Sequence, residues 1–541
     1  MKDFLIITEK NTDQSDLKDG GYSLLKTLKR SLPNYNIMSF NFKGDENEYT
    51  YPIYESNKFE RRLKNANFIQ SKICEVAEAY KTIIFIHISM CFGFSKKPSD
   101  VEFVLFPMFL TPSYKFSGHV IPEQYKLLES KVLQLCDRIF TPSMYEMSQL
   151  TDLYKVPRDK IVIVPRGVPN FNQKKTVRNS TSKKHIVFCS LASIKPQKNT
   201  IDLIYAFKEI AKNHDCSLKI IGAIQNKNYY KKVLDIINEY NLGDRIVFTG
   251  YIPHNNIPTE LNDAHFHIIT SKCETFGRSI YETLSMGIPN ICLRTNNASF
   301  DYLSDYPFIS FLDDFSSILD IVETMISNYS ILSELSIKII DQFNDDLLGD
   351  LLASKLMKEN SVIIADYDGT IYDKNDELKT LQNVSIFNKY PLRIICSSRS
   401  TSFLKEEITR LNIKADYIIA YSGAVITNGN FEELSVHQIK NNIIKLKPIF
   451  YNGKIVQYEG NPKEILSWRV EKYSDKSFTS KLETSKLSSI IKLLKIINWK
   501  GDVVAFGDSK YDYEFLRFFD GYLIETNKDN NNKFKLVNEI L

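Results

Sequence analysis

Ile364–Thr370, with the sequence Ile-Ala-Asp-Tyr-Asp-Gly-Thr, is an apolar strand pattern that ends in two aspartates one residue apart. In a strand this spacing directs the side chains of Asp366 and Asp368 to the same side. Two like charges held so close are costly unless a cation neutralises them or one of them binds a proton. Phosphate-ester chemistry uses such a pair, because one carboxylate attacks phosphorus, the other handles the proton, and magnesium bridges protein and phosphate.

The other groups that this chemistry needs follow in the sequence. A second apolar strand ends at Ser397, whose hydroxyl can bond a phosphoryl oxygen. Lys486 begins a helical pattern and can hold the negative charge that grows during phosphoryl transfer. A third strand, Val503–Phe506, leads into Asp508 and Asp512, which suit an oxygen-rich magnesium site. A lone serine after a strand is usually a turn residue and a lone lysine before a helix is usually solvated, so the prediction depends on the whole set.

This set of motifs resembles the haloacid dehalogenase superfamily, specifically its sugar-phosphatase branch, over about residues 360–541. In that branch a cap domain precedes the lysine and selects the substrate. Here the cap would span about residues 425–482, which is short and would admit a larger substrate. The resemblance implies that Asp366 is the nucleophile, Asp368 the general acid/base, Ser397 and Lys486 the phosphate binders, and Asp366, Asp368, Asp508 and Asp512 the Mg²⁺ site.

The composition is that of an ordinary globular protein, with 43% hydrophobic and 25% charged residues among 541. A chain of this length exceeds one core, so we expect several compact units. The net charge of +4 gives no basis for nucleic-acid binding. The eight cysteines are scattered without a Cys-x-x-Cys pair, which indicates buried free thiols in a reducing compartment. With no signal-peptide pattern and no apolar stretch long enough to cross a bilayer, we expect a cytoplasmic protein without a transmembrane segment.

Short apolar strands alternate with amphipathic helices along the chain, a pattern typical of parallel sheets in α/β layers. One series occupies residues 1–175 and a second occupies residues 180–334, with a linker at 170–184 that is poor in apolar groups. We expect residues 335–358 to form a helix that packs back on the first domain, and residues 360–541 to form the third domain. The expected strands are Phe4–Ile7, Thr82–Ile86, Phe103–Phe106 and Ile161–Val164 in the first series, and His185–Cys189, Ser217–Ile221, Arg245–Thr249, His265–Thr270 and Asn290–Leu293 in the second.

A second chemical centre lies in Ser271–Pro289. A strand ends there, Glu274 lies in the loop, and Glu282 lies on the helix that follows. The N-terminus of such a helix can receive a diphosphate on its free N–H groups. Glu282 can accept hydrogen bonds from ribose hydroxyls and Glu274 from sugar hydroxyls. The spacing alone also fits a helix with one capping and one solvated glutamate, so the choice depends on the rest of the chain.

The segment resembles the Glu-x7-Glu signature of retaining glycosyltransferases of the GT-B type, the class that contains sucrose-phosphate synthases and bacterial sugar-lipid transferases. The resemblance covers about residues 1–358 and implies two Rossmann-like domains that hold a nucleotide-sugar donor in the cleft between them, without a metal. It implies that Lys198 binds the diphosphate and that glycines near the first helix let the backbone approach the donor phosphates, although glycines in a turn often make only the turn. The donor residues it implies are Gly20, Gly21, Lys198, Glu274, Phe276, Gly277, Arg278 and Glu282.

Two positions depart from this class. Ser193 stands where the class usually carries an arginine, five residues before the lysine, and Lys195 nearby is a point charge without a guanidinium fork. Met108 stands where the class often carries a histidine near the sugar. Other histidines are available as substitutes, although a lone histidine is also common as a structural group. The residues that we place in a possible acceptor site are His87, His119 and Arg166.

A run of basic residues lies in a predicted helix of the first domain. Such a run is usually a solvated face, but it can also dock a phosphorylated acceptor or an anionic membrane, and the same Coulomb attraction acts in both cases. The sequence therefore leaves a peripheral membrane contact open. The residues of this basic run are Arg61, Arg62, Lys64 and Lys72.

Two sites on one chain predict a bifunctional enzyme that catalyses consecutive steps. The first step moves a sugar from a nucleotide-diphosphate sugar to a sugar or polyol phosphate, and the second removes the phosphate through an aspartyl-phosphate with Mg²⁺. Sucrose- and trehalose-type synthesis pairs the same activities, which is an analogy at the level of fold. Two alternatives stay open: a capsule or cell-surface glycan transferase whose phosphatase acts on a separate metabolite, and a nucleotide-sugar-binding protein with an inactive transferase half. Ser193 and the absence of the class histidine at Met108 are the arguments for the second alternative.

Overall fold

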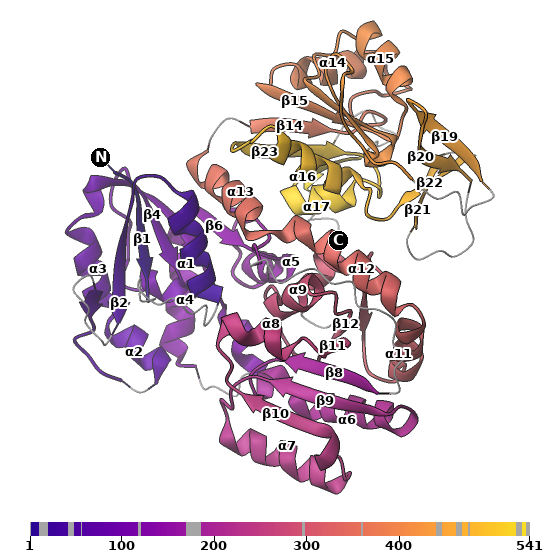
Figure 1. Ribbon diagram of the computed structural model, residues 1–541. Helices are drawn as coiled ribbons and strands as arrows, with labels where there is room; N and C mark the ends of the chain where they lie inside the picture. The colour runs from indigo at the N-terminus through magenta and orange to yellow at the C-terminus, as the bar shows by residue number, and fades with distance from the viewer. Residues whose placement is uncertain are drawn as a thin grey trace. The chain divides into compact units, whose positions relative to one another are not determined.

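The computed structural model divides the chain into two units, Met1–Ser336 and Ile337–Leu541. Both units are α/β structures in which helices cover the faces of mostly parallel sheets (Figure 1). The predicted α/β fold class is therefore confirmed. The structure describes residues 2–9, 20–41, 48–55, 57–116, 121–168, 185–294, 298–358, 361–439, 446–460, 468–473, 476–525 and 533–536, and the predicted linker at 170–184 lies outside these ranges.

The first sheet of unit 1 is doubly wound. In the described residues its seven strands are all parallel and have the order β3-β2-β1-β4-β5-β6-β7. The order reverses between β1 and β4, and sheets of this kind bind ligands at the carboxyl ends of the strands beside such a reversal. The bounds are β1 (Lys2–Thr8), β2 (Tyr35–Asn41), β3 (Glu48–Thr50), β4 (Tyr80–Ile86), β5 (Glu102–Phe106), β6 (Arg138–Thr141) and β7 (Ile161–Ile163), with helices α1 (Gly20–Ser31), α2 (Lys58–Lys64), α3 (Ala66–Cys74), α4 (Glu123–Leu135) and α5 (Met144–Ser148).

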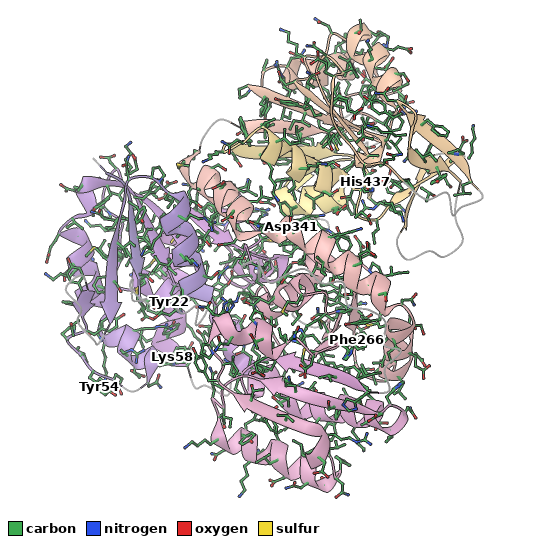
Figure 2. All side chains as sticks on the ribbon, in the orientation of Figure 1. Tyr22, Tyr54, Lys58, Phe266, Asp341 and His437 are labelled. Carbon is green, nitrogen blue, oxygen red and sulfur yellow. The ribbon has the colours of Figure 1, made fainter. Side chains whose placement is uncertain are left out.

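The second sheet of unit 1 has the same design. Six parallel strands of the described chain lie in the order β10-β9-β8-β11-β12-β13, which reverses between β8 and β11. All four residues of β11 are buried, including Phe266 (Figure 2), because helices cover both faces of a parallel sheet. The bounds are β8 (Ile186–Leu191), β9 (Cys216–Ile221), β10 (Ile246–Gly250), β11 (Phe266–Ile269), β12 (Asn290–Leu293) and β13 (Ile309–Leu312), with helices α6 (Thr200–Asn213), α7 (Lys227–Glu239), α8 (Ile257–Glu260), α9 (Arg278–Ser285), α10 (Ser299–Leu303) and α11 (Ile318–Ser327).

The main sheet of unit 2 has at its centre the three apolar strands that precede Asp366, Ser397 and Asp508. Within the described ranges the strand order is β18-β17-β16-β15-β14-β23-β24-β25, and β14 is parallel to both β15 and β23. The bounds are β14 (Ser361–Ala365), β15 (Leu392–Cys396), β16 (Tyr417–Ala420), β17 (Val425–Asn428), β18 (Glu433–Val436), β23 (Asp502–Gly507), β24 (Tyr522–Glu525) and β25 (Lys533–Leu536), with helices α14 (Glu377–Phe387), α15 (Thr401–Arg410), α16 (Lys486–Ile496) and α17 (Tyr513–Phe519).

The predicted cap span of 425–482 includes two strands of the main sheet. Residues 425–436 form β17 and β18, which extend the main sheet by antiparallel pairing rather than joining a cap. The separate small sheet is antiparallel, with the order β19-β20-β22-β21 among the described residues. Its strands are β19 (Lys447–Tyr451), β20 (Lys454–Glu459), β21 (Trp468–Tyr473) and β22 (Lys476–Lys481).

The segment 335–358 is not one helix. It contains the end of α12 (Tyr329–Ile340) and α13 (Asp345–Met357), and the side chain of Asn344 caps α13 by accepting the N–H of Asp346 at 2.7 Å. α13 packs against β23, and Lys355 pairs with Asp502 at 2.9 Å. α13 belongs to unit 2, and the expected packing of this segment on the first domain stays a prediction.

Most of the cysteines are buried free thiols, as the sequence predicted. All eight cysteines are free, and seven of them are buried, with Cys74 exposed. In the part of the chain that the structure describes, no helix combines the length and the apolar character needed to span a membrane.

Candidate functional site

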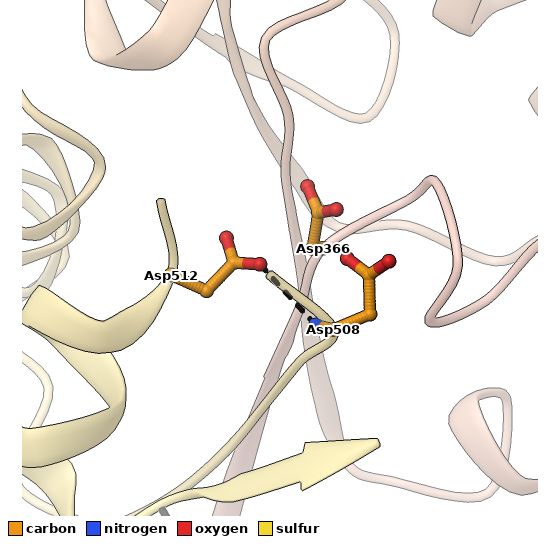
Figure 3. A group of neighbouring side chains, drawn as sticks. All are labelled: Asp366, Asp508 and Asp512. Atoms are coloured by element: carbon orange, nitrogen blue, oxygen red, sulfur yellow. Dashed lines mark hydrogen bonds between the residues drawn. The ribbon is translucent and has the colours of Figure 1, made fainter. Parts of the chain in front are cut away.

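The carboxyl ends of three adjacent strands bring together the residues predicted for phosphate chemistry. Asp366 follows β14, Ser397 follows β15 and Asp508 follows β23. Oxygens from the carboxylates of Asp366, Asp508 and Asp512 all lie within 4.8 Å of one another (Figure 3). Parallel pairing places these strand ends at one edge of the sheet, so residues that are far apart in the sequence form one cluster, which we call the carboxylate cluster.

Lys486 is the cation of the carboxylate cluster. It is buried, and its Nζ donates to Oδ1 of Asp366 at 2.8 Å and to Oδ1 of Asp512 at 2.6 Å. It is the first residue of α16, whose start is set by a capping box between Ser485 and Ser488. The cap positions the lysine, and the N-terminus of the helix adds a favourable field for negative charge.

The charges of the carboxylate cluster fit a divalent cation. Three carboxylates and one ammonium group sum to −2. Burial, together with the charge of Asp512, raises the pKa of Asp508 to about 7. Burial likewise raises the pKa of Asp366 above its usual range, against the pull of Lys486. A cation with oxygen ligands relieves this repulsion, and Asp366 and Asp508 are suited to hold it.

Asp512 also orients other residues of the carboxylate cluster. Its Oδ2 accepts the N–H of Asp508 at 3.2 Å and the hydroxyl of Ser509 at 2.9 Å, while its Oδ1 accepts from Lys486. These bonds hold the loop after β23 in place. Asp512 therefore orients Asp508 and the lysine in addition to contributing charge.

Asp368 lies outside the carboxylate cluster. Its carboxylate forms a two-point ion pair with Arg399, with Nε to Oδ2 at 2.9 Å and Nη2 to Oδ1 at 2.8 Å. Both of its oxygens accept hydrogen bonds from the guanidinium, and the part of its side chain in binding Mg²⁺ stays a prediction. Its role in proton transfer stays a prediction. The sequence analysis assigned no role to Arg399, although its place two residues after Ser397 was the available signal.

Ser397 is buried at the end of β15. Its N–H donates to the carbonyl of Ile419 at 2.8 Å, and its hydroxyl accepts the N–H of Arg399 at 3.2 Å. The hydroxyl thus shapes the turn that carries Arg399. Phosphate binding by Ser397 stays a prediction.

Gly369 allows the loop after β14 to approach Asp508. Its φ of +74° is in the left-handed region, and a Cβ there would lie 1.9 Å from Oδ2 of Asp508. We expect Gly369→Ala to displace Asp508 and to lower kcat for p-nitrophenyl phosphate by about 10²-fold. Gly453→Ala is the matched control, because Gly453 has φ of +75° with nothing within 4 Å of a Cβ. Equal losses in the two variants would show that backbone strain, and not crowding of Asp508, is the cause.

The second candidate site is a cavity of about 420 Å³ in unit 1, which we call the transferase cavity. Loops after β8, β9, β10 and β11 and the start of α9 form most of its wall. Ser23, in the first turn of α1, also lines it, whereas Gly20 and Gly21 do not. The predicted donor residues that line it are Lys198, Glu274, Phe276, Gly277, Arg278 and Glu282, and the predicted acceptor residue Arg166 lines it too.

Both glutamates of the transferase cavity are paired with cations. Glu274 contacts the ammonium group of Lys198. Glu282 is buried, and its Oε1 lies 2.8 Å from Nε of Arg278 and 2.9 Å from Nε2 of His254. Burial alone would raise the pKa of Glu282, but Arg278 and His254 bring it below its ordinary value, so the carboxylate stays ionised. Neither glutamate is the solvated surface group that the spacing alone allowed.

Gly277 sets the start of α9. It is the N-cap residue, with φ of +77°, so the helix begins at Arg278 beside the cavity. Phe276 stacks on Tyr281 with ring centroids 4.5 Å apart. The first N–H groups of α9 and the guanidinium of Arg278 therefore belong to one wall, which suits an anionic ligand.

Several lining residues were missed by the sequence analysis: Gly222, Gln225, Tyr251 and His254. A Cβ on Gly222 would lie 2.3 Å from the carbonyl oxygen of Ala192, so glycine lets the loops after β8 and β9 meet. A histidine and a glycine in loops after apolar strands were the only signals, and such residues are common.

Of the two histidines predicted for the acceptor site, His87 lies in the described residues. Nδ1 of His87 accepts the N–H of Ser89 at 3.1 Å and caps the short turn Ile88–Cys91, with φ of +92° at the histidine. His87 is not among the residues that line the transferase cavity. His119 lies outside the described residues. Met108, at the position of the class histidine, has its Sδ 3.2 Å from Nη2 of Arg166.

The basic run does not form one exposed patch. Arg62 is buried and pairs with Glu9 at 2.7 Å, so it is neither a solvated nor a docking residue. Lys64 pairs with Glu55 at 2.8 Å and Lys72 with Glu75 at 2.6 Å. Carboxylates thus neutralise three of the four cations, which removes most of the Coulomb attraction for an anionic surface.

Two family models each match part of one unit. Residues 172–306 match the family described as glycosyl transferases group 1. Residues 363–455 match the haloacid dehalogenase-like hydrolases. The chain therefore carries a group 1 glycosyltransferase domain of the GT-B fold, joined to a haloacid dehalogenase-like hydrolase domain, and both resemblances are confirmed. It is an enzyme of the transferase and hydrolase classes.

The individual relatives that align with the chain have low sequence identity to it. The chain is 22% identical over 292 residues to the uncharacterized glycosyltransferase YqgM of Bacillus subtilis (strain 168), covering 52% of this chain and 76% of that protein. It is 28% identical over 182 residues to the alpha-monoglucosyldiacylglycerol synthase of Streptococcus pneumoniae (strain ATCC BAA-255 / R6), covering 31% of this chain and 40% of that protein. Among solved structures, the sucrose-phosphate synthase of Thermosynechococcus elongatus aligns with a TM-score of 0.52 at 14% identity, over 66% of this chain and 98% of that one, and so shares the fold.

Proposed function

We propose that the enzyme is bifunctional. Unit 1 transfers a sugar, with retention of configuration, from a nucleotide-diphosphate sugar to a sugar or polyol phosphate, and unit 2 then removes the phosphate from the product. The observation that carries this proposal is that one chain assembles two polar sites, the transferase cavity and the carboxylate cluster. The fold shared with a sucrose-phosphate synthase supports a phosphorylated acceptor, whose product is a phosphomonoester that a phosphatase can hydrolyse.

In unit 2 the nucleophile is Asp366. Its carboxylate oxygen bonds to phosphorus while the ester P–O bond breaks, and the departing alcohol oxygen takes a proton from Asp368. Water then attacks the phosphorus of the aspartyl-phosphate and gives a proton back to Asp368, which frees phosphate and restores both carboxyl groups. Lys486 offsets the charge on the phosphoryl oxygens, and Ser397 donates a hydrogen bond to them. Mg²⁺ held by Asp366 and Asp508 would neutralise the phosphate and the carboxylates when it is bound.

In unit 1 the bond between C1 of the sugar and the β-phosphate oxygen breaks. The acceptor hydroxyl oxygen bonds to C1 on the same face, and its proton passes to the departing phosphate oxygen. Lys198 and the N-terminus of α9 hold the diphosphate, Glu282 accepts hydrogen bonds from the ribose, and Glu274 accepts from the sugar. Basic groups and the N-terminus of a helix hold the leaving diphosphate here, so this step needs no metal ion.

A second candidate function is transfer to a lipid-linked acceptor in cell-surface glycan assembly, with a phosphatase that acts on a separate metabolite. The similarity to a relative named as an alpha-monoglucosyldiacylglycerol synthase favours this candidate. The pairing of the basic run with carboxylates weighs against it, because the run offers little unneutralised charge to an anionic membrane.

Mass spectrometry of products from a panel of nucleotide sugars and sugar phosphates with Mg²⁺ tests the proposal. We expect a glycoside without phosphate, and one inorganic phosphate for each nucleoside diphosphate released. Transfer to a glycolipid acceptor only, with phosphate released from unrelated sugar phosphates, would favour the second candidate. Bound nucleotide without transfer or donor hydrolysis would mean that unit 1 is a binding domain.

A further inference from the structure

The small antiparallel sheet of unit 2, which we call the cap sheet, contacts the main sheet's loops through one face of β21. Arg469 and Glu471 lie two residues apart on this strand, so their side chains point to the same side. Nη2 of Arg469 lies 2.8 Å from Oε2 of Glu514, in the first turn of α17. The carboxylate of Glu471 is buried and accepts the hydroxyl of Ser422, in the turn after β16. β21 is thus tied to two separate segments of the phosphatase core.

Glu514 connects β21 to the start of α16. Its other carboxylate oxygen, Oε1, accepts the hydroxyl of Ser485 at 3.2 Å. Ser485 is the N-cap residue of α16, and the same hydroxyl accepts the N–H of Ser488 at 3.0 Å. A hydroxyl that donates to Glu514 directs its lone pairs toward the helix. The carboxylate therefore fixes the orientation in which Ser485 caps α16.

The residue that follows this N-cap is Lys486, the cation of the carboxylate cluster. Its side chain is 2% exposed, and its Nζ contacts Asp366 and Asp512, so it has little room to adjust if the start of α16 moves. Asp512 is itself the N-cap residue of α17, two residues before Glu514. The starts of α16 and α17, which pack against each other, are therefore joined twice, once at Lys486 and once at Ser485.

The second contact of β21 leads to the same helix. Ser422 precedes Gly423, whose carbonyl accepts the hydroxyl of Ser489 in α16 at 2.5 Å. A Cβ on Gly423 would lie 2.3 Å from the carbonyl oxygen of Ser485, so this turn packs directly against the start of the helix. Both contacts of β21 with the core thus reach the start of α16 through separate segments.

We propose that Arg469 and Glu514 are positioning residues of the phosphatase, which set the place of the Lys486 ammonium group through the N-cap of α16. This role deepens the proposed function of unit 2 and rests on it. Negative charge grows on the phosphoryl oxygens during transfer, and a displacement of about 1 Å in a group that meets this charge costs up to about 10²-fold in rate. Arg469 thus acts on the reaction through Glu514 and not by touching the phosphate.

The test is steady-state hydrolysis of p-nitrophenyl phosphate by the full-length enzyme with Mg²⁺, with inorganic phosphate and orthovanadate as competitive inhibitors. We expect Arg469→Ala and Glu514→Ala each to lower kcat by roughly 10-fold and to leave KM within about twofold of the wild type. Inhibition by vanadate, which takes the geometry of the transition state, should weaken by a similar factor. Inhibition by phosphate, which resembles the ground state, should change little.

The two substitutions should not be additive, because both break one connection. The double variant should lose no more kcat than Glu514→Ala alone. Arg469→Lys should recover part of the loss, since an ammonium group keeps the charge without the guanidinium fork. Ser485→Thr keeps the N-cap hydroxyl and should keep kcat, whereas Ser485→Ala should lower it.

Arg393→Ala is the matched control. Arg393 pairs with Asp416 at 2.8 Å, and the side chains of Arg393 and Arg469 are both 18% exposed. Arg393 lies near the start of β15, whereas the carboxylate cluster lies at the carboxyl ends of the strands. We expect this variant to keep the kcat and KM of the wild type. Urea unfolding shows which variants are folded at the assay temperature, and Arg469→Gln and Glu514→Gln replace any alanine variant that is not.

The outcomes separate the positioning role from the proposed function. Unchanged kcat in Arg469→Ala and Glu514→Ala, or equal losses of vanadate and phosphate inhibition, would overturn the positioning role and leave the phosphatase proposal standing. An equal loss of kcat in Arg393→Ala would have the same meaning. A wild-type enzyme that releases no phosphate from p-nitrophenyl phosphate or from sugar phosphates would overturn both.

Discussion

Asp366→Asn is expected to stop phosphate release and to leave nucleotide release intact. The amide is not a nucleophile, and removing a catalytic nucleophile costs at least roughly 10⁴-fold in kcat. The substitution also removes one of the three negative charges of the carboxylate cluster. With donor and acceptor both present, the phosphorylated glycoside should accumulate, and mass spectrometry with a phosphate assay measures both effects.

Asp373→Asn is the matched control for this experiment. Asp373 is a buried aspartate near the same loop, but it pairs with Lys379 at 2.7 Å and is not part of the carboxylate cluster. We expect this variant to keep its phosphatase activity. Loss of nucleotide release in Asp366→Asn would contradict the view that the two centres work independently.

Glu282→Ala is expected to weaken binding of the nucleotide-sugar donor by about 10²-fold. The substitution removes the acceptor for ribose hydroxyls and leaves Arg278 and His254 without their buried carboxylate. Hydrogen bonds to charged groups are worth about 1.5–3 kcal/mol each. Titration with the donor measures the change in Kd. Hydrolysis of p-nitrophenyl phosphate should be unchanged, because the other unit carries it out.

Stability must be followed in the same variant. Breaking a buried ion pair typically costs about 3–5 kcal/mol, so a fall in donor affinity counts only if urea unfolding shows that the variant is folded at the assay temperature. Glu282→Gln keeps the shape and isolates the charge. Glu209→Ala, a surface glutamate of α6 paired with Lys212 at 2.6 Å, controls for loss of an ion pair elsewhere in the domain. Unchanged donor affinity in Glu282→Ala would remove this residue from the donor site.

Much of the fold was predictable because strand patterns are local. The runs around Ile84, Ile220 and Ile364 are apolar and short, and the structure places each of them in a parallel sheet covered by helices. The boundaries of the predicted cap and of the helix before the third domain were less predictable. β17 pairs with β16 and β18 pairs with β17, so both strands belong to the main sheet, and the segment 335–358 is interrupted before α13, which begins after its N-cap Asn344. Both outcomes depend on which distant part of the chain each segment packs against.

The carboxylate cluster was the most predictable part of the sites. Asp366 and Asp508 end adjacent parallel strands, and any fold that pairs those strands must bring their carboxyl ends to one edge. The partner of Asp368 was not predictable, because the reach of Arg399 depends on the course of the turn after β15. In the same way, His254 reaches Glu282 across two loops that the sequence does not relate to each other.

The sequence by itself determined where chemistry can occur in this protein, because polar residues that end apolar strands are local features, and parallel sheets collect strand ends at one edge. The tertiary structure alone decided how the charges are paired: Lys486 between two aspartates, Arg399 on Asp368, and Lys198 on Glu274. Pairing depends on distances of a few ångströms between side chains from separate loops. Coulomb energy falls with distance and grows with burial, and residue order encodes neither.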